Sequence, residues 1–235
     1  MLNLFQHDEQ VVTSAGSLLE KDVILKLYLC SINFCNMKTN KLTILSLLFS
    51  ILIVVTSCKD KKPLPFLAPT PIASFNFLNQ DSLSITNQTF KGKVYIADFF
   101  FTSCTSICPT MHRKMKAIFE AYKDEPNLMF LSHTIDYKYD VPSKLKKYAE
   151  KLGVDGPRWQ FAYGTKDAIY DIAEKSYLSA VIEDQNEKEK YIHQGWFLLI
   201  DGNGRMRGAY DSTHDDQIAL LKNDLDNLLT ETQNK

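Results

Sequence analysis

Two cysteines four positions apart, Cys104 and Cys108, are the residues of this chain best placed for chemistry. They follow a largely apolar stretch, residues 93–101, that is typical of a strand buried on both faces, and Pro109 then suits the first turn of a helix. If the helix begins in this turn, both sulfurs lie on one side, near unpaired amides that favour thiolate over thiol. The spacing therefore predicts a reactive pair, with a structural disulfide as the alternative.

A third candidate ligand is His193, which lies shortly before the apolar stretch 196–200 and could reach the same end of a sheet. Two thiolates and one imidazole form a soft set of low coordination number that suits copper. Zinc is the competitor if a fourth ligand joins. On the residues alone, a solvated loop histidine is the alternative reading of His193.

Other residues near the pair have more ordinary interpretations. Met111 and Met115 recur at helical spacing and are expected in the core rather than on a metal. His112 stands beside two basic residues, which favours a solvated helix face. His133 lies in an apolar stretch and is expected to be a core or edge histidine with its hydrogen bonds made.

The alternation of strand and helix patterns indicates an α/β fold. A β-α-β opening, closed by a hairpin and a terminal helix, predicts a thioredoxin-like three-layer α/β/α sandwich with a mixed central sheet. The expected strands are 93–101, 128–135, 160–163, 196–200 and 206–210, and the expected helices start at Pro109, at 143, at 166 and near 215.

A targeting signal precedes the domain. Lys38 and Lys41 stand before an apolar run, residues 42–55, and small residues then lead to Cys58. About 14 apolar residues are few for a spanning helix, which needs roughly 20. The pattern predicts a lipoprotein signal peptide, residues 37–57, with Cys58 lipidated; an uncleaved membrane anchor is the alternative.

The rest of the chain divides around this signal. We expect that residues 1–36 lie upstream of the true translation start and are included because the gene start is placed too early. The alternative is that they are a genuine extra segment. Residues 58–72 are charged and then proline-rich, so we expect an extended tether, and residues 73–232 form the domain. The 27 basic and 28 acidic residues leave a net charge of −1, which gives no reason to expect nucleic acid as a partner.

The cysteine turn and the later histidine resemble the Sco/SenC family. The resemblance lies in Cys104-x-x-x-Cys108-Pro109, in His193 at 193 − 104 = 89 positions further on, and in the apolar strand and Asp201-Gly202 that follow. It covers roughly residues 73–229. The histidine's neighbours differ from the usual Asp-His context of the family.

Membership would imply a membrane-tethered thioredoxin fold in the bacterial cell envelope, with the domain outside the cytoplasm. It would also imply one copper, Cu(I) or Cu(II), on Cys104, Cys108 and His193, delivered to the copper-bearing subunit of cytochrome c oxidase or to another copper protein. The alternative is a thiol-disulfide oxidoreductase that keeps a partner's cysteines reduced. Asp136, in a family-like pair with Asp140, either supports the site or is a plain strand-end carboxylate.

Overall fold

A computed structural model describes residues 63–154, 156–179, 181–183, 191–193 and 195–233, with no side chains for 181–183, 191–193 and 233. The upstream segment 1–36, the signal peptide 37–57 and Cys58 lie outside the described residues and stay predictions. Within the described part of the chain, no helix is both long enough and apolar enough to cross a membrane.

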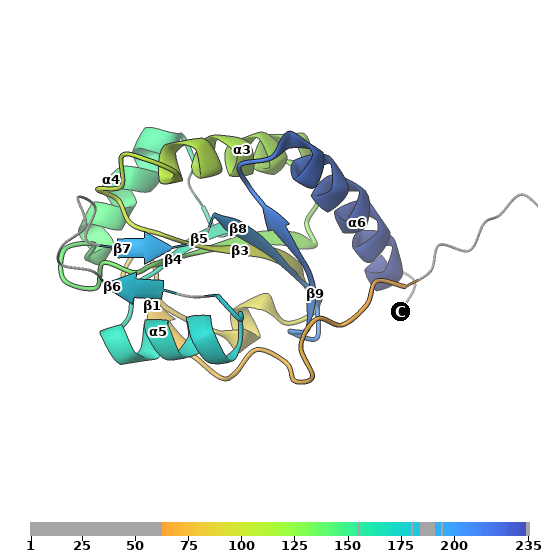
Figure 1. The fold of residues 1–235 in the computed structure, drawn as a ribbon, viewed down its shortest axis with the longest axis horizontal. Helices are drawn as coiled ribbons and strands as arrows, with labels where there is room; N and C mark the ends of the chain where they lie inside the picture. The colour runs from red at the N-terminus through yellow and green to blue at the C-terminus, as the bar shows by residue number, and fades with distance from the viewer. Residues whose placement is uncertain (1–62, 155, 180, 184–190, 194, 234–235) are drawn as a thin grey trace, which may run out of the picture. The chain divides into compact units, whose positions relative to one another are not determined.

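A mixed five-stranded sheet forms the centre of the domain (Figure 1). Its strands are β3 (Val94–Phe100), β4 (Leu128–Thr134), β5 (Trp159–Ala162), β8 (Trp196–Ile200) and β9 (Met206–Asp211). The spatial order is β5-β4-β3-β8-β9, with β3, β4 and β5 parallel and β8 antiparallel to both of its neighbours. Each strand lies within one residue of its predicted bounds, because its apolar pattern is strong.

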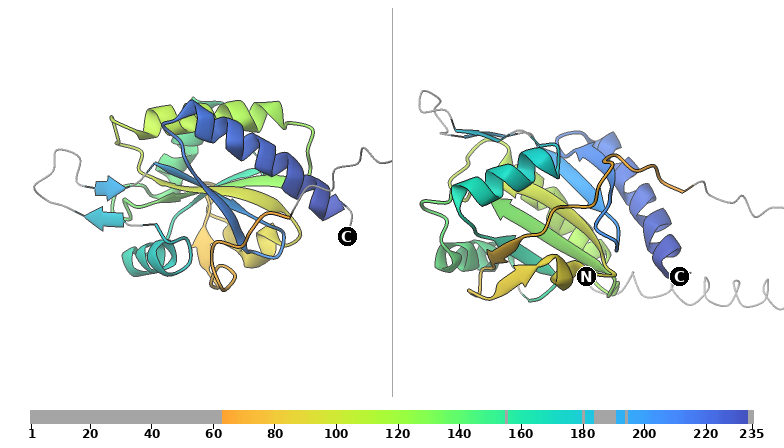
Figure 2. Two further views of the ribbon diagram at one scale, coloured as in Figure 1. Left: turned by 45° about the vertical axis from the view of Figure 1, so that its right-hand side comes forward. Right: turned by 90° about the horizontal axis from the view of Figure 1, so that it is seen from below.

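Helices cover both faces of this sheet, which confirms the predicted three layers (Figures 1 and 2). On one face lie α3 (Cys108–Ala121), α4 (Pro142–Leu152) and α6 (Asp215–Gln233), and on the other lies α5 (Lys166–Lys175). Within the first layer, rings from α3 and α4 both pack on Phe161 of β5. The parallel β3-α3-β4 unit thus carries the cysteines at the end of a central strand.

The short elements were not predicted. They are β1 (Asn76–Leu78), β2 (Ser84–Thr86), the 3-10 helix η1 (Asn87–Phe90), β6 (Val181–Glu183) and β7 (Tyr191–His193). Strands of three residues are too short to show a hydrophobic period. β6 and β7 form an antiparallel hairpin apart from the main sheet, and His193 is paired with Val181 in its register (Figure 2).

The core is centred on β3, in which all seven residues are buried. On the facing side of α3, Met111, Met115 and Ile118 are fully buried, as the helical spacing predicted. Burying each such side chain contributes about 1.5–3 kcal/mol. The end of β3 and the start of α3 are therefore held firmly by the core on both sides of the cysteine turn.

Residues 63–72, the described part of the proline-rich segment, are packed along β9. The amides of Leu67 and Ile72 donate to the carbonyls of Met206 and Gly204 at 2.9 and 2.8 Å. Arg207, only 5% exposed, donates to the carbonyl of Leu64 at 2.6 Å and forms an ion pair with Asp201. Ala68 and Ile72 are buried, so this segment is part of the folded unit.

His133 of β4 is fully buried, in a ring of aromatic side chains. Its ring stacks on Phe99 at 4.8 Å and meets the edges of Phe77 and Tyr177. Nδ1 lies 3.3 Å from the carbonyl oxygen of Asp98, whereas Nε2 makes no hydrogen bond within the described residues. The prediction of a core position is confirmed, but one ring nitrogen is left unsatisfied. Burial lowers the pKa of His133 to about 4, so the ring is neutral.

This histidine should make the fold sensitive to acid. Because the unfolded chain binds a proton at about pH 6.5 and the folded chain only near pH 4, stability falls as pH drops between these values. The loss is at most about 3 kcal/mol. Urea unfolding of His133→Phe at pH 7, 6, 5 and 4 should show a correspondingly weaker acid destabilisation than wild type. His214→Gln, which removes a largely exposed ring, is the control. Parallel pH curves for wild type and His133→Phe would contradict this account.

Candidate metal centre

The cysteine turn brings the two sulfurs side by side. Cys104 and Cys108 are not joined by a disulfide and are 7% and 1% exposed, Cys104 in the turn after β3 and Cys108 at the first position of α3. The Cys108 amide donates to Cys104 Sγ at 3.4 Å, and the Cys104 amide donates to the carbonyl of Phe101 at 3.2 Å. The four-residue spacing therefore places both sulfurs together at the start of the helix, as the sequence predicted.

Cys104 Sγ takes the place of a helix cap. The residue at the N-cap position of α3, Ile107, has no side-chain acceptor, and Pro109 in the first turn has no amide to satisfy. The sulfur thus receives a first-turn amide at the positive end of the helix dipole. Both effects favour a negative charge on Cys104.

The Cys108 thiol is a weak acid. Hydrogen bonding to the Cys104 sulfur, followed by burial, raises the pKa of the Cys108 thiol far above its ordinary value. Cys108 therefore keeps its proton, and the amide directed at Cys104 Sγ favours that sulfur as the site of a negative charge. The pair acts as a coupled unit with one nucleophilic sulfur and one protonated partner.

A buried carboxylate holds the start of the cysteine turn. Asp140 is fully buried, and one of its oxygens accepts hydrogen bonds from the Thr102 amide at 2.8 Å and from Thr134 Oγ1 at 2.7 Å. The other oxygen accepts from Thr102 Oγ1 and pairs with Lys144 Nζ at 2.9 Å. Asp140 thus ties Thr102, two residues after β3, to Thr134 at the end of β4.

The sequence had offered Asp136, not Asp140, as the supporting carboxylate. Asp136 is 3% exposed and shapes the turn, because its carbonyl accepts the Asp140 amide at 2.9 Å and its Oδ1 accepts the Tyr139 amide at 3.3 Å. It therefore places Asp140, and any closer role for Asp136 stays a prediction. The sequence shows Asp140 as the second aspartate of the pair. It does not show the contact with Thr102, because the two residues are distant along the chain.

The prediction that His112 lies on a solvated helix face is wrong. The ring is fully buried, with Nε2 2.9 Å from Asp98 Oδ2 and Nδ1 2.8 Å from Tyr148 Oη. Positions 108 and 112 share a helix face, which the neighbouring basic residues had obscured. Asp98 Oδ1 makes no hydrogen bond within the described part of the chain. Asp98 and His112, both fully buried, thus form a hydrogen-bonded chain with the half-buried Tyr148, one helical turn beyond Cys108.

His193 is placed only by its backbone. The β3–β8 register pairs Ala97 with Leu198, so the start of β8, which follows His193 closely, lies at the cysteine end of β3. The histidine side chain is outside the described residues. Among the side chains that are described, no three His, Cys, Asp or Glu residues are grouped to hold a metal. The structure therefore describes both sulfurs and leaves the third ligand as a prediction.

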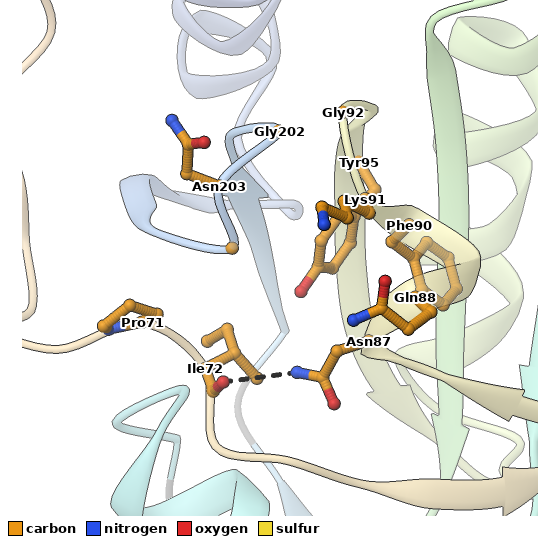
Figure 3. Close-up of a pocket in the computed structure, with 11 residues that line it drawn as sticks. Pro71, Ile72, Asn87, Gln88, Phe90, Lys91, Gly92, Tyr95, Gly202 and Asn203 are labelled. Carbon is orange, nitrogen blue, oxygen red and sulfur yellow. Dashed lines mark hydrogen bonds between the residues drawn. The ribbon is translucent and has the colours of Figure 1, made fainter.

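The clearest cavity lies away from this chemistry. It has a volume of about 400 Å³ and lies between Gly92, which precedes β3, and Gly202, which follows β8 (Figure 3). These residues mark the end of the sheet opposite the cysteine turn. Asn87 Nδ2 donates to the carbonyl of Ile72 at 3.3 Å across its rim. We therefore do not connect this cavity with the two sulfurs.

A model of the SCO1/SenC family matches residues 68–229. The chain belongs to this family. A relative from Bacillus subtilis, a SCO1 protein homolog, is 30% identical to this Sco chain over 192 residues, which cover 79% of this chain and 97% of that protein.

Solved structures agree with the fold. A SCO1/SenC family lipoprotein from Bacillus anthracis has a TM-score of 0.64 at 29% identity and covers 72% of this chain and 98% of its own. BsSco, described as having a disulfide switch and as belonging to the Sco family of cytochrome c oxidase assembly proteins, has a TM-score of 0.59 at 29% identity, covering 68% and 96%. Copper-bound Sco structures from Bradyrhizobium japonicum, Arabidopsis thaliana and yeast share the fold at 21%, 20% and 22% identity.

The raised pKa of Cys108 and the amide directed at Cys104 Sγ predict the order of alkylation. With limiting iodoacetamide on the reduced protein, Cys104 should react first, because Cys108 keeps its proton and is almost fully buried. Peptide mass mapping separates the two positions from the other cysteines. In the Cys104→Ser variant, Cys108 should react slowly. Preferential labelling of Cys108 in the wild-type protein would show that the thiolate lies on the other sulfur.

The Asp140 contacts predict a measurable loosening of the cysteine turn. Asp140→Asn keeps the shape but removes the charge and replaces an acceptor oxygen by a donor, so we expect a loss of about 2–4 kcal/mol in unfolding free energy. Amide hydrogen exchange at Thr102 should accelerate. Lys144→Met is the control, because its partly exposed ammonium contributes about 1 kcal/mol or less. Unchanged exchange at Thr102 in Asp140→Asn would remove Asp140 from this role.

Proposed function

We propose that this Sco protein is a copper chaperone that holds one copper ion through Cys104, Cys108 and His193. The receiving protein is proposed to be the copper-bearing subunit of cytochrome c oxidase. The observation that carries the proposal is that the sulfurs of Cys104 and Cys108 lie together at a helix start. They lie at the end of the sheet where β8, the strand that follows His193, begins.

The donor chemistry fits copper. Two thiolate sulfurs are soft ligands that select Cu(I), and one imidazole completes a set of low coordination number. Met111 and Met115 are fully buried in the core, so their thioethers are not presented at the turn. Zinc in a structural site takes four ligands, one more than the three proposed here.

The same three proposed ligands would also allow copper to be loaded and released. Binding copper through both sulfurs requires Cys108 to lose the proton that it holds in the free protein, so loading releases protons. A partner's thiolates can then replace the ligands one at a time, because a three-ligand set leaves room for an incoming sulfur. We expect the partner to approach the copper from the side of Cys104, which is the less buried of the two cysteines.

A second function, thiol-disulfide reduction, is favoured by the asymmetry of the pair. The Cys104 thiolate attacks one sulfur of a partner's disulfide, a mixed disulfide forms, and the other partner sulfur leaves as a thiolate. Cys108 then loses its proton and attacks Cys104 Sγ, which releases the second partner thiolate. The partner gains two electrons, and Cys104 and Cys108 end as a disulfide.

We further propose that the chain is anchored in the bacterial cell envelope by lipid on Cys58 after removal of residues 37–57, with the domain facing the periplasm or the outside. The support is the signal-like pattern before Cys58. A copper-bearing subunit in the same membrane would then be within reach.

Copper retention separates the two functions. The reduced wild-type protein should retain one copper per chain and, with Cu(II), show a thiolate-to-copper charge-transfer band. Cys104→Ser should lose both, and His193→Ala should lose or alter both while still reducing a model disulfide. His214→Ala removes a largely exposed imidazole and is the matched control. If the wild-type protein retains no copper but turns over the disulfide readily, it is a reductase and the chaperone proposal is wrong.

A further inference from the structure

An exposed apolar surface lies where the described part of the chain begins. Phe66 and Leu67 are 54% and 44% exposed, although both are large hydrophobic side chains. Three prolines beside them are exposed as well. Neighbouring apolar side chains that stay open to solvent together commonly mark a contact surface. We call this surface the tether surface, and it consists of Pro63, Pro65, Phe66, Leu67 and Pro69.

The ring of Phe66 is held in its exposed position. Its centroid lies 4.2 Å from the guanidinium carbon of Arg205 and 4.7 Å from that of Arg207. Arg207 is fixed by ion pairs with Asp201 and Glu231. The guanidinium of Arg205 donates to the carbonyl of Pro69 at 3.2 Å. Because both cations are tied to their neighbours, the ring stays at the surface with positive charge beside it.

The tether surface and the cysteine turn lie at opposite ends of the sheet. The Leu67 amide donates to the carbonyl of Met206, the first residue of β9. Met206 is paired with Ile200, and Ile200 with Tyr95 near the start of β3. The cysteine turn follows the other end of this seven-residue strand, about 23 Å away at 3.3 Å per residue. In Figure 1 the orange segment accordingly lies beside the end of α6, away from the turn between β3 and α3.

Chain length keeps the tether surface close to the proposed lipid anchor. Pro63 follows Cys58 by five residues (63 − 58), and an extended chain spans at most about 3.6 Å per residue. Pro63 therefore lies no more than about 18 Å from the anchored residue. Of the four residues between them, Lys59, Lys61 and Lys62 are basic, and anionic lipid headgroups attract such a cluster. A lipid surface is thus within reach of the exposed apolar side chains.

We infer that the tether surface docks on the membrane, with Phe66 and Leu67 at the boundary between headgroups and acyl chains and Arg205 beside lipid phosphate. The inference rests on the proposed lipid anchor at Cys58. A protein contact added to a lipid anchor binds more firmly than the anchor alone. It also fixes the orientation of the domain, so that the cysteine turn faces away from the bilayer, toward the projecting part of a membrane-bound partner.

Quenching of tryptophan emission by brominated lipid tests this inference. Phe66→Trp places an indole on the tether surface. Tyr139→Trp is the matched control, because Tyr139 is 57% exposed and follows β4 at the cysteine end of the sheet. The lipidated full-length protein is reconstituted into vesicles of phosphatidylglycerol with brominated acyl chains. Phe66→Trp should lose emission and shift to shorter wavelength relative to the wild-type background of Trp159 and Trp196. Tyr139→Trp should show neither change.

A second reporter guards against a local disturbance of the ring. Leu67→Trp replaces a side chain that contacts neither arginine ring-on, and it should be quenched as Phe66→Trp is. Circular dichroism and retained copper check that each variant is folded. If neither reporter is quenched in membrane-bound protein, or if Tyr139→Trp is quenched equally, the anchor alone holds the domain and the inference is wrong.

The remaining outcomes separate the inference from the proposals on which it depends. If the emission of Phe66→Trp shifts to shorter wavelength with rising protein concentration in lipid-free detergent, a second copy covers the tether surface and the inference is wrong. If mass spectrometry finds no lipid on Cys58 and the protein does not float with the vesicles, the anchor proposal fails together with the inference. Copper retention in the His193→Ala comparison is measured independently, so the proposed chaperone function stands or falls by itself.

Discussion

One backbone amide, the N–H of Cys108, is directed at the sulfur of Cys104, and the chemistry of the domain depends on that contact. It makes the Cys104 sulfur a helix cap, while hydrogen bonding of the Cys108 thiol to that sulfur, together with burial, keeps Cys108 protonated. Two identical side chains thereby become different reagents. The surrounding structure maintains this contact: β3 brings the turn to the sheet edge, and α3 supplies the amide.

This asymmetry bears on both proposed functions, copper transfer and disulfide exchange. Each function needs an accessible thiolate, here Cys104, and a second sulfur, here Cys108. The second sulfur reacts only after copper or a partner's sulfur has bound to Cys104. Metal loading and disulfide formation both remove the Cys108 proton, so they compete for the same reduced state. The redox state of the pair would thus decide whether copper can bind at all.

Much of this fold follows from the sequence because its strands and helices are long and periodic. The strands of the main sheet and the buried methionines of α3 were predictable for that reason. The β6–β7 hairpin was not, since three residues carry no period. His112 was misjudged because its sequence neighbours are basic, whereas burial depends on the face shared with Cys108 and on Asp98, which lies in another element. The Asp140–Thr102 contact joins residues distant in sequence, and no local pattern shows it.

Because residues 63–72 pack on the domain, the N-terminal boundary of a shortened protein must lie before them. A chain cut at residue 73, where the prolines end, would lose the amides that pair with Met206 and Gly204 and uncover the hydrophobic surface beneath Ala68 and Ile72. It would also take the Leu64 carbonyl from the guanidinium of Arg207, leaving a nearly buried charge with fewer acceptors. A soluble form suited to metal titration or crystallisation should therefore start before residue 63, even though composition alone marks that stretch as dispensable linker.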